Sequence, residues 1–136
     1  MLHIAEVAAA TLKSENIRQV GLLATDGTLK ADFYPDYLHR MGIHCSLPST
    51  KIQAIVMQGI YQVKAGKIRA GARLLEQAAE HLFEQGVEKI ILGCTEIPLA
   101  FDAIDSPLRR RALDASQTLA QACVDWYQLR NKAIAA

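Results

Sequence analysis

The feature that most constrains the fold is an alternation between short apolar runs and longer segments of helical periodicity. Apolar runs of five or six residues predict strands that are buried on both faces. They lie at residues 19–24, 43–47 and 87–92. Around them, apolar residues recur at intervals of three and four, which predicts helices. These helices are expected at residues 2–13, 31–40, 51–66 and 74–86, with a last one after Pro107.

Strands that alternate with helices of this length are joined by right-handed crossovers, which make the sheet parallel. We therefore expect one α/β domain over residues 1–136, a small parallel sheet flanked by helices. A chain of 136 residues buries roughly two thirds of its unfolded surface on folding. Such a core requires neither disulfides nor a structural metal.

The charge balance argues against two classes of partner. The chain carries 15 Lys and Arg against 14 Asp and Glu, a formal net charge of +1, so its field is too weak to attract a phosphate backbone or an anionic membrane. No apolar run approaches the ~18 to 20 residues that span a bilayer, and Glu6 interrupts the apolar N-terminus, so no signal peptide is indicated. We expect a cytoplasmic protein with no nucleic-acid partner and no membrane partner.

Two glycine-containing loops follow predicted strands, at Thr25-Asp26-Gly27-Thr28 and at Gly93-Cys94-Thr95-Glu96. Ligands of open α/β sheets bind beyond the carboxyl ends of the strands, where backbone N–H groups are free. Both loops carry hydroxyls suited to holding a carboxylate. Taken alone, the first loop fits an ordinary turn equally well.

Cys94 is the candidate reactive residue. Its expected place between a strand end and a helix start favours the thiolate, the reactive form, Gly93 would let a substrate approach, and the Thr95 hydroxyl could donate a hydrogen bond. The alternative is that Cys94 is a small buried hydrophobic side chain, as most free cysteines are. Cys45, inside a predicted strand, and Cys123, inside the last helix, are expected to have core or surface roles.

Other polar residues favour ordinary roles. The three cysteines and the four histidines show no metal-ligand spacing, so no metal site is expected. The run Arg109-Arg110-Arg111 is interpreted as a solvated turn, because it lacks interleaved aromatic residues.

The segment Leu92-Gly93-Cys94-Thr95-Glu96-Ile97-Pro98-Leu99 resembles the aspartate/glutamate (hydantoin) racemase family, and its aspartate racemase branch most of all. The segments that corroborate this resemblance, in chain order, are Leu2-His3-Ile4, Val20 to Thr28, Lys51-Ile52-Gln53, Gly86-Val87 and Leu113-Asp114-Ala115-Ser116. The resemblance covers nearly the whole chain, as the C-terminal portion of such a protein. It implies a flavodoxin-like half of a two-domain fold with the site between similar halves.

The resemblance also implies a chemistry. Members of this family racemise amino acids without a cofactor, by two thiols on opposite faces of the substrate, one removing the Cα proton and the other delivering one. Cys94 corresponds to one of those thiols. By resemblance, Thr95 and the loop with Thr25, Gly27 and Thr28 would hold carboxylate oxygens. Lys51 would bind the side-chain carboxylate of an acidic substrate, and Glu96 would orient a neighbouring group or the substrate amine.

The family's second cysteine belongs to an upstream half, usually in a Cys-Asn-Thr segment, which this sequence does not contain. We expect the isolated chain to be an incomplete racemase that pairs with a complementary N-terminal half or self-associates as a homo-oligomer. In the family, the last helix packs on the first half. Trp126 and Leu129 are therefore expected to lack their usual cover.

Two alternatives to racemisation remain open. Maleate isomerase and arylmalonate decarboxylase of the same superfamily also place a cysteine at this position, so another reaction on a small carboxylate fits the motif. A non-catalytic carboxylate-binding or subunit-interaction module fits as well, and it predicts ligand binding without turnover.

Overall fold

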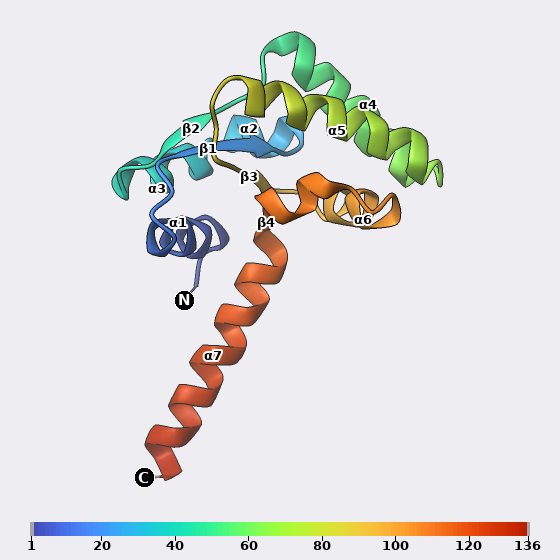
Figure 1. The fold of residues 1–136 in the computed structure, drawn as a ribbon. Coiled ribbons are helices and arrows are strands. Elements are labelled where there is room, and N and C mark those ends of the chain that lie inside the picture. Colours follow the sequence, from blue (N-terminus) through green and yellow to red (C-terminus); the bar gives the residue numbers. More distant parts are fainter. Residues whose placement is uncertain (1, 136) are drawn as a thin grey trace.

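The computed structural model describes residues 2–135 as a four-stranded parallel sheet with helices on both faces (Figure 1). The strands are β1 (Gln19–Leu23), β2 (His44–Ser46), β3 (Lys89–Leu92) and β4 (Ala112–Asp114), in the order β2-β1-β3-β4. The helices are α1 (Ile4–Ser14), α2 (Asp26–Ala31), α3 (Phe33–Arg40), α4 (Thr50–Lys64), α5 (Ile68–Glu84), α6 (Glu96–Ala103) and α7 (Ala115–Ala135), with a short 3₁₀ helix, η1 (Pro107–Arg111). The expected α/β class with a parallel sheet is confirmed.

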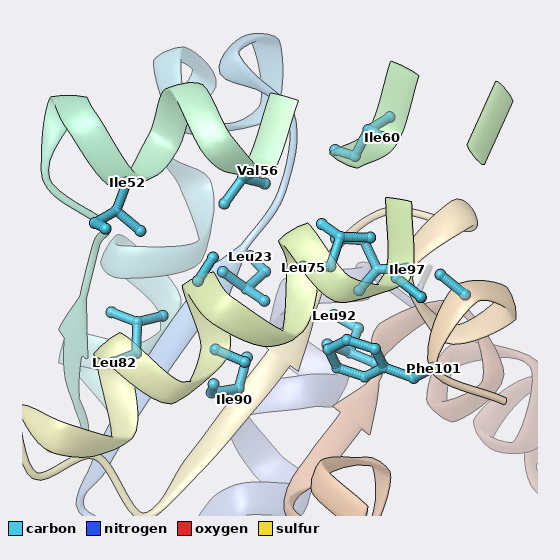
Figure 2. Packing of buried hydrophobic residues seen from close by; sticks show 14 of the residues in the cluster. Leu23, Ile52, Val56, Ile60, Leu75, Leu82, Ile90, Leu92, Ile97 and Phe101 are labelled. Carbon is cyan, nitrogen blue, oxygen red and sulfur yellow. The ribbon is translucent and has the colours of Figure 1, made fainter. Parts of the chain in front are cut away.

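The sheet is buried on both faces, as its continuous apolar strands predict. Leu23, Ile90 and Leu92 point to one side, where they pack against α4, α5 and α6 (Figure 2). Leu22 and Ile91 point to the other side, against α1, α3 and the start of α7. Successive residues of one strand thus serve two hydrophobic clusters, which is the alternation that a pleated strand imposes.

Helices α4 and α5 pack closely because glycines face each other at their contact. A Cβ added to Gly71 would lie 2.6 Å from the Gly59 carbonyl oxygen and 2.6 Å from Val63 Cγ2. A Cβ added to Gly59 would lie 2.8 Å from Leu75 Cγ. No side chain fits between these backbones, so both positions require glycine.

The structure contains two elements that the sequence did not predict, α2 and β4, and it shows the helix expected to start after Cys94 as α6. Residues 25–28 were expected to form a tight loop, but Thr25 caps the short helix α2, its Oγ1 accepting from the Thr28 amide at 3.3 Å. Helix α6 contains Pro98 in its first turn, where proline is tolerated. Strand β4 has only three residues, too few for a strand pattern to show. In addition, α5 begins at Ile68, six residues before the expected 74.

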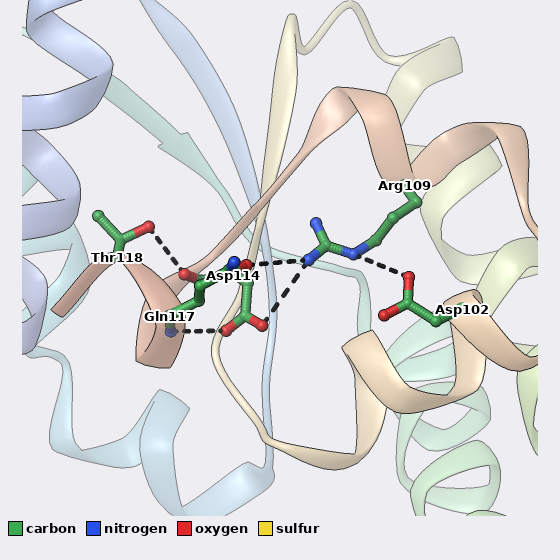
Figure 3. A network of polar contacts seen from close by, with 5 residues as sticks. All are labelled: Asp102, Arg109, Asp114, Gln117 and Thr118. Atoms are coloured by element: carbon green, nitrogen blue, oxygen red, sulfur yellow. Dashed lines mark hydrogen bonds and ion pairs between the residues drawn. The ribbon is translucent and has the colours of Figure 1, made fainter. Parts of the chain in front are cut away.

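Arg109 joins the connection after α6 to the start of α7, so its expected role as part of a solvated turn is wrong (Figure 3). Its Nε lies 3.3 Å from Asp102 Oδ1, and its Nη2 lies 3.8 Å from Asp114 Oδ2. The Nε contact is a charge contact only, because the buried N–H has no hydrogen-bond acceptor there. Asp114 Oδ1 in turn accepts a hydrogen bond from the backbone N–H of Gln117 at 3.1 Å, which caps the first turn of α7.

Helix α7 projects away from the sheet (Figure 1). Of its 21 residues, Ala115 is the buried one, and Trp126 and Leu129 are 53% and 68% exposed. The expectation that these two side chains lack cover is confirmed. Within residues 2–135, no helix is both long enough and apolar enough to cross a membrane.

We predict that Gly71→Ala destabilises the protein by about 1 to 3 kcal/mol, the usual cost of overpacking a tight contact. The new methyl group would meet backbone atoms of Gly59 and Val63, which cannot rotate away. Urea unfolding followed by circular dichroism measures the change. Gly27→Ala is the matched control, because its Cβ would meet only Thr25 Oγ1 at 3.9 Å. Equal unfolding midpoints for the two variants would contradict the prediction.

Candidate functional site

The two candidate loops lie side by side at the carboxyl edge of the sheet. β1 and β3 are neighbours in parallel register, with Leu23 opposite Leu92, and the Gly93 amide donates to the Leu23 carbonyl at 2.9 Å. From β1 the chain crosses to β2 on one side, whereas from β3 it crosses to β4 on the other. The carboxyl ends of β1 and β3 therefore form the switch point at which ligands of such sheets bind.

The two loops lie so close together that position 93 requires glycine. A Cβ at this position would lie 3.1 Å from Ala24 Cβ and 3.4 Å from Leu22 Cδ1, which is too tight for relaxed packing. The glycine thus lets the chain after β3 lie against the end of β1. It brings Cys94 to the same edge as Thr25.

Cys94 contacts a carboxylate. Its Sγ donates to Glu96 Oε2 at 2.7 Å, and the Thr95 hydroxyl donates to the same oxygen at 3.0 Å. Lys64, at the end of α4, places its Nζ 4.0 Å from the other carboxylate oxygen, Oε1. The structure therefore brings together three residues that the sequence singled out, Cys94, Thr95 and Glu96, and adds Lys64, which it did not.

The environment of Cys94 favours the protonated thiol. Burial raises the pKa of the Cys94 thiol to about 11, and its hydrogen bond to Glu96 and the charge of that carboxylate raise it as well, while Lys64 opposes them. The hydrogen bond from Cys94 is the main cause that lowers the pKa of Glu96. The expectation that the helix start favours a thiolate is thus wrong for this structure, because burial and the contact with Glu96 raise the pKa of the thiol.

The loop after β1 forms a hydroxyl pair. Thr25 Oγ1 donates to Thr28 Oγ1 at 3.2 Å and accepts from the Thr28 amide at 3.3 Å. Since a hydroxyl has a single proton, the Thr28 proton is free to point at a ligand. Gly27 lies in the first turn of α2, exposed to solvent.

Gln53 holds this loop from α4, a role that the sequence analysis did not give it although it named the segment Lys51-Ile52-Gln53. Its Nε2 donates to the Ala24 carbonyl and to Asp26 Oδ1, both at 3.0 Å. Two acceptors around one nitrogen set the orientation of the amide. The opposite atom, Oε1, is buried without a hydrogen-bond partner. The available signal was a glutamine beside Ile52 at the start of the apolar stripe of α4.

Lys51 lies exposed in the first turn of α4. Among residues 2–135, no ion pair joins it to another side chain, and the lysine that meets Glu96 is Lys64. The substrate-binding role of Lys51 stays a prediction.

The other two thiols lie where the sequence suggested. Cys45 belongs to β2 and packs against the cluster beneath α1 and α3, where burial raises its pKa to about 12. Cys123 is exposed on α7. In the described part of the chain, no three His, Cys, Asp or Glu side chains gather in a group that could hold a metal ion.

Comparisons with known proteins agree with this geometry. The family model described as Asp/Glu/Hydantoin racemase matches residues 1–123. An uncharacterised protein from the pnlA 3' region of Pectobacterium carotovorum subsp. carotovorum is 39% identical over 131 residues, which cover 96% of this chain and 87% of that protein. A glutamate racemase from Lactiplantibacillus plantarum is 28% identical over 99 residues, 71% of this chain and 34% of the relative.

The fold is also similar to solved structures. A candidate Asp/Glu racemase from Yersinia pestis superimposes with a TM-score of 0.80 at 32% identity, over 92% of this chain and 55% of that one. The chain thus spans about half of that solved racemase and about a third of the glutamate racemase. The match over residues 1–123, with Cys94 at the shared edge of the sheet, shows that the chain belongs to the Asp/Glu/hydantoin racemase family.

Proposed function

We propose that this chain supplies one acid/base face of a cofactor-independent amino-acid racemase whose substrate is aspartate or glutamate. The observation that carries the proposal is the Cys94 thiol at the switch point of the sheet, donating to Glu96 at 2.7 Å. A thiol that borders a ligand edge and has a carboxylate as its proton acceptor is equipped for proton transfer. Racemase activity of the family and of named relatives supports this reaction class.

The proposed step moves one proton. As a base, the Cys94 thiolate takes the proton from Cα, and the electron pair left on Cα spreads into the α-carboxylate. Hydrogen-bond donors must stabilise that charge, and the free Thr28 proton is suited to it, whereas the Thr95 hydroxyl would first have to release Glu96. In the reverse direction the Cys94 thiol returns a proton to Cα. Lys51 would bind the side-chain carboxylate of the substrate.

The high pKa of Cys94 makes this residue a better proton donor than proton acceptor at neutral pH. A thiol with a pKa near 11 is protonated at neutral pH, so Cys94 is set to donate. To act as a base it must first lose its proton, and the Glu96 carboxylate in contact with Sγ is the nearest acceptor. Because the pKa of Glu96 is lowered, this carboxylate is a weak base toward a thiol with a pKa near 11, and we assign it the role of orienting the thiol.

Inversion at Cα requires a second acid/base group on the opposite face of the substrate. Of the other two thiols, Cys45 lies within β2 and Cys123 on α7, so neither shares the loop of Cys94. We propose that a complementary N-terminal half or a second copy of this chain supplies the group. The exposed apolar face of α7 supports such a partner, because large exposed apolar patches mark interaction surfaces.

The first prediction from this proposed function concerns proton exchange at Cα of the substrate. In deuterated water, the chain should replace the Cα proton of aspartate or glutamate by deuterium, which proton NMR follows. Cys94→Ser should lower the rate at least 100-fold, since it removes the acid/base group, and Cys123→Ser is the control that should not change it. Exchange in one enantiomer without inversion indicates that Cys94 is the one acid/base group in use. Exchange with inversion indicates that a second copy of the chain supplies the acid/base group on the opposite face of the substrate. Absence of Cys94-dependent exchange would contradict the proposal.

The second prediction concerns the protonation of Cys94. With a pKa near 11, only about one thiol in 1,000 is ionised at pH 8, so iodoacetamide should modify Cys94 slowly and about tenfold faster per pH unit. Glu96→Gln removes one of the causes that raise this pKa, the neighbouring negative charge, and should increase the rate at pH 8 several-fold. Mass spectrometry of the Cys94 peptide in a Cys123→Ser background measures both.

The matched control for this prediction is Glu84→Gln, an exposed carboxylate at the end of α5. It should leave the modification rate of Cys94 unchanged. Rapid modification of Cys94 at pH 7 in the otherwise unchanged chain, or equal rates for Glu96→Gln and Glu84→Gln, would show that Glu96 does not hold the thiol.

The third prediction concerns assembly. If α7 is covered by a second copy, light scattering after gel filtration should give a mass above that of the monomer, rising with concentration. Replacing Trp126 and Leu129 by serine should shift the mass toward the monomer, because it removes apolar surface that is 53% and 68% exposed. A monomer over a wide concentration range would count against a second copy and leave the complementary half as the partner to be found.

A further inference from the structure

The net charge of +1 is the sum of charges that are unevenly distributed along the chain. Residues 37–75 contain no Asp or Glu, and their cations are Arg40, Lys51, Lys64, Lys67, Arg69 and Arg73. The last four of these gather where α4 ends and α5 begins. We call Lys67, Arg69 and Arg73 the cationic tip, because all three are exposed at or just after the turn between the two helices.

The cationic tip borders the loop that carries Cys94. Lys64, the last residue of α4, places its Nζ 4.0 Å from Glu96 Oε1, so the turn between α4 and α5 lies beside the start of α6. From there α5 packs against α6, and Leu75 and Ile97 belong to one cluster (Figure 2). The first turns of α5 therefore lie near the carboxyl edge of the sheet.

The two arginines lie on a side of α5 that is turned toward the end of α6. Arg69, Arg73 and Glu76 are spaced by four and three residues, so they share one face of the helix. On that face Glu76 Oε2 accepts from the Ser106 hydroxyl at 2.5 Å, and Ser106 follows α6. Within residues 2–135, no carboxylate forms an ion pair with Lys67 or with either arginine.

The carboxylates at the other end of α5 belong to the opposite edge of the sheet. Glu84 ends α5, and Glu88 directly precedes β3. Glu88 Oε1 accepts from the amides of Arg18 and Gln19, at the start of β1. The carboxyl end of the sheet thus lies beside the positive end of α5, and unpaired charges of one sign raise the rate at which ligands of the opposite sign arrive.

We propose that the cationic tip directs anionic carboxylates to the edge that carries Cys94, and so favours an acidic substrate over a neutral amino acid. The inference rests on the proposed function only for the identity of that substrate. The tip acts on the rate of encounter and requires no contact with the bound ligand. Its effect must weaken with salt, because the Debye length falls from about 30 Å at 0.01 M to about 3 Å at 1 M.

Two alkylating reagents test the field at Cys94 without any racemase activity. Iodoacetate is an anion and iodoacetamide is neutral. Both alkylate the same thiolate with loss of iodide, so the ratio of their rates cancels the ionisation of Cys94. Lys67→Gln, Arg69→Gln and Arg73→Gln together should lower the iodoacetate-to-iodoacetamide ratio about threefold or more at about 0.01 M salt, and should have no effect at about 1 M. Mass spectrometry of the Cys94 peptide measures both rates.

Lys13→Gln, Arg18→Gln and Lys132→Gln together are the matched control. They remove the same number of positive charges from exposed residues of α1, of the segment before β1 and of α7. This control should leave the ratio at Cys94 unchanged. An unchanged ratio in the tip variant, or an equal fall in the control, would overturn the proposal. Failure of the racemase function shows itself separately, as missing proton exchange at Cα.

Discussion

The hydrogen bond from the Gly93 amide to the Leu23 carbonyl determines where every candidate group of this protein lies. It continues the parallel pairing of β1 and β3 by one residue beyond the strands, so that the two loops leave the sheet together. The parallel pairing of β1 and β3 places Cys94 and Thr25 at the same edge of the sheet, and this hydrogen bond holds the two loops against each other. The absence of a side chain at residue 93 is what allows this contact, since a Cβ would press on Ala24.

At that edge, two opposing effects act on Cys94. Burial and the neighbouring Glu96 carboxylate disfavour the thiolate, and Lys64 favours it from the far side of the carboxylate. Burial and the carboxylate outweigh Lys64. Glu96 Oε2 is in contact with the sulfur, whereas the Lys64 ammonium lies 4.0 Å from Oε1, the other carboxylate oxygen. A partner that placed a cation near Sγ, or drew Glu96 aside, would change this balance. The resting state is therefore a property of the isolated chain that assembly can alter.

The sequence predicted the sheet better than it predicted the connections. Strands β1, β2 and β3 follow from continuous apolar runs in the sequence, and α4 follows from its apolar periodicity. β4 and α2 were not predicted because they are short and, unlike β2 in the run 43–47, they lie in no longer apolar run. The motif around Cys94 located the thiol and its neighbour Glu96, but the contact of Lys64 with Glu96 depends on how α4 packs beside that loop. Such long-range contacts leave no local pattern in the chain.

Gln53 shows why a buried polar residue deserves a different interpretation from an exposed one. An exposed glutamine satisfies both ends of its amide with water, so its position carries little information. At 9% exposure, Gln53 must find protein partners, and it finds them on the nitrogen side alone. These two donations fix the loop after β1, whereas the buried Gln53 oxygen without a donor is destabilising.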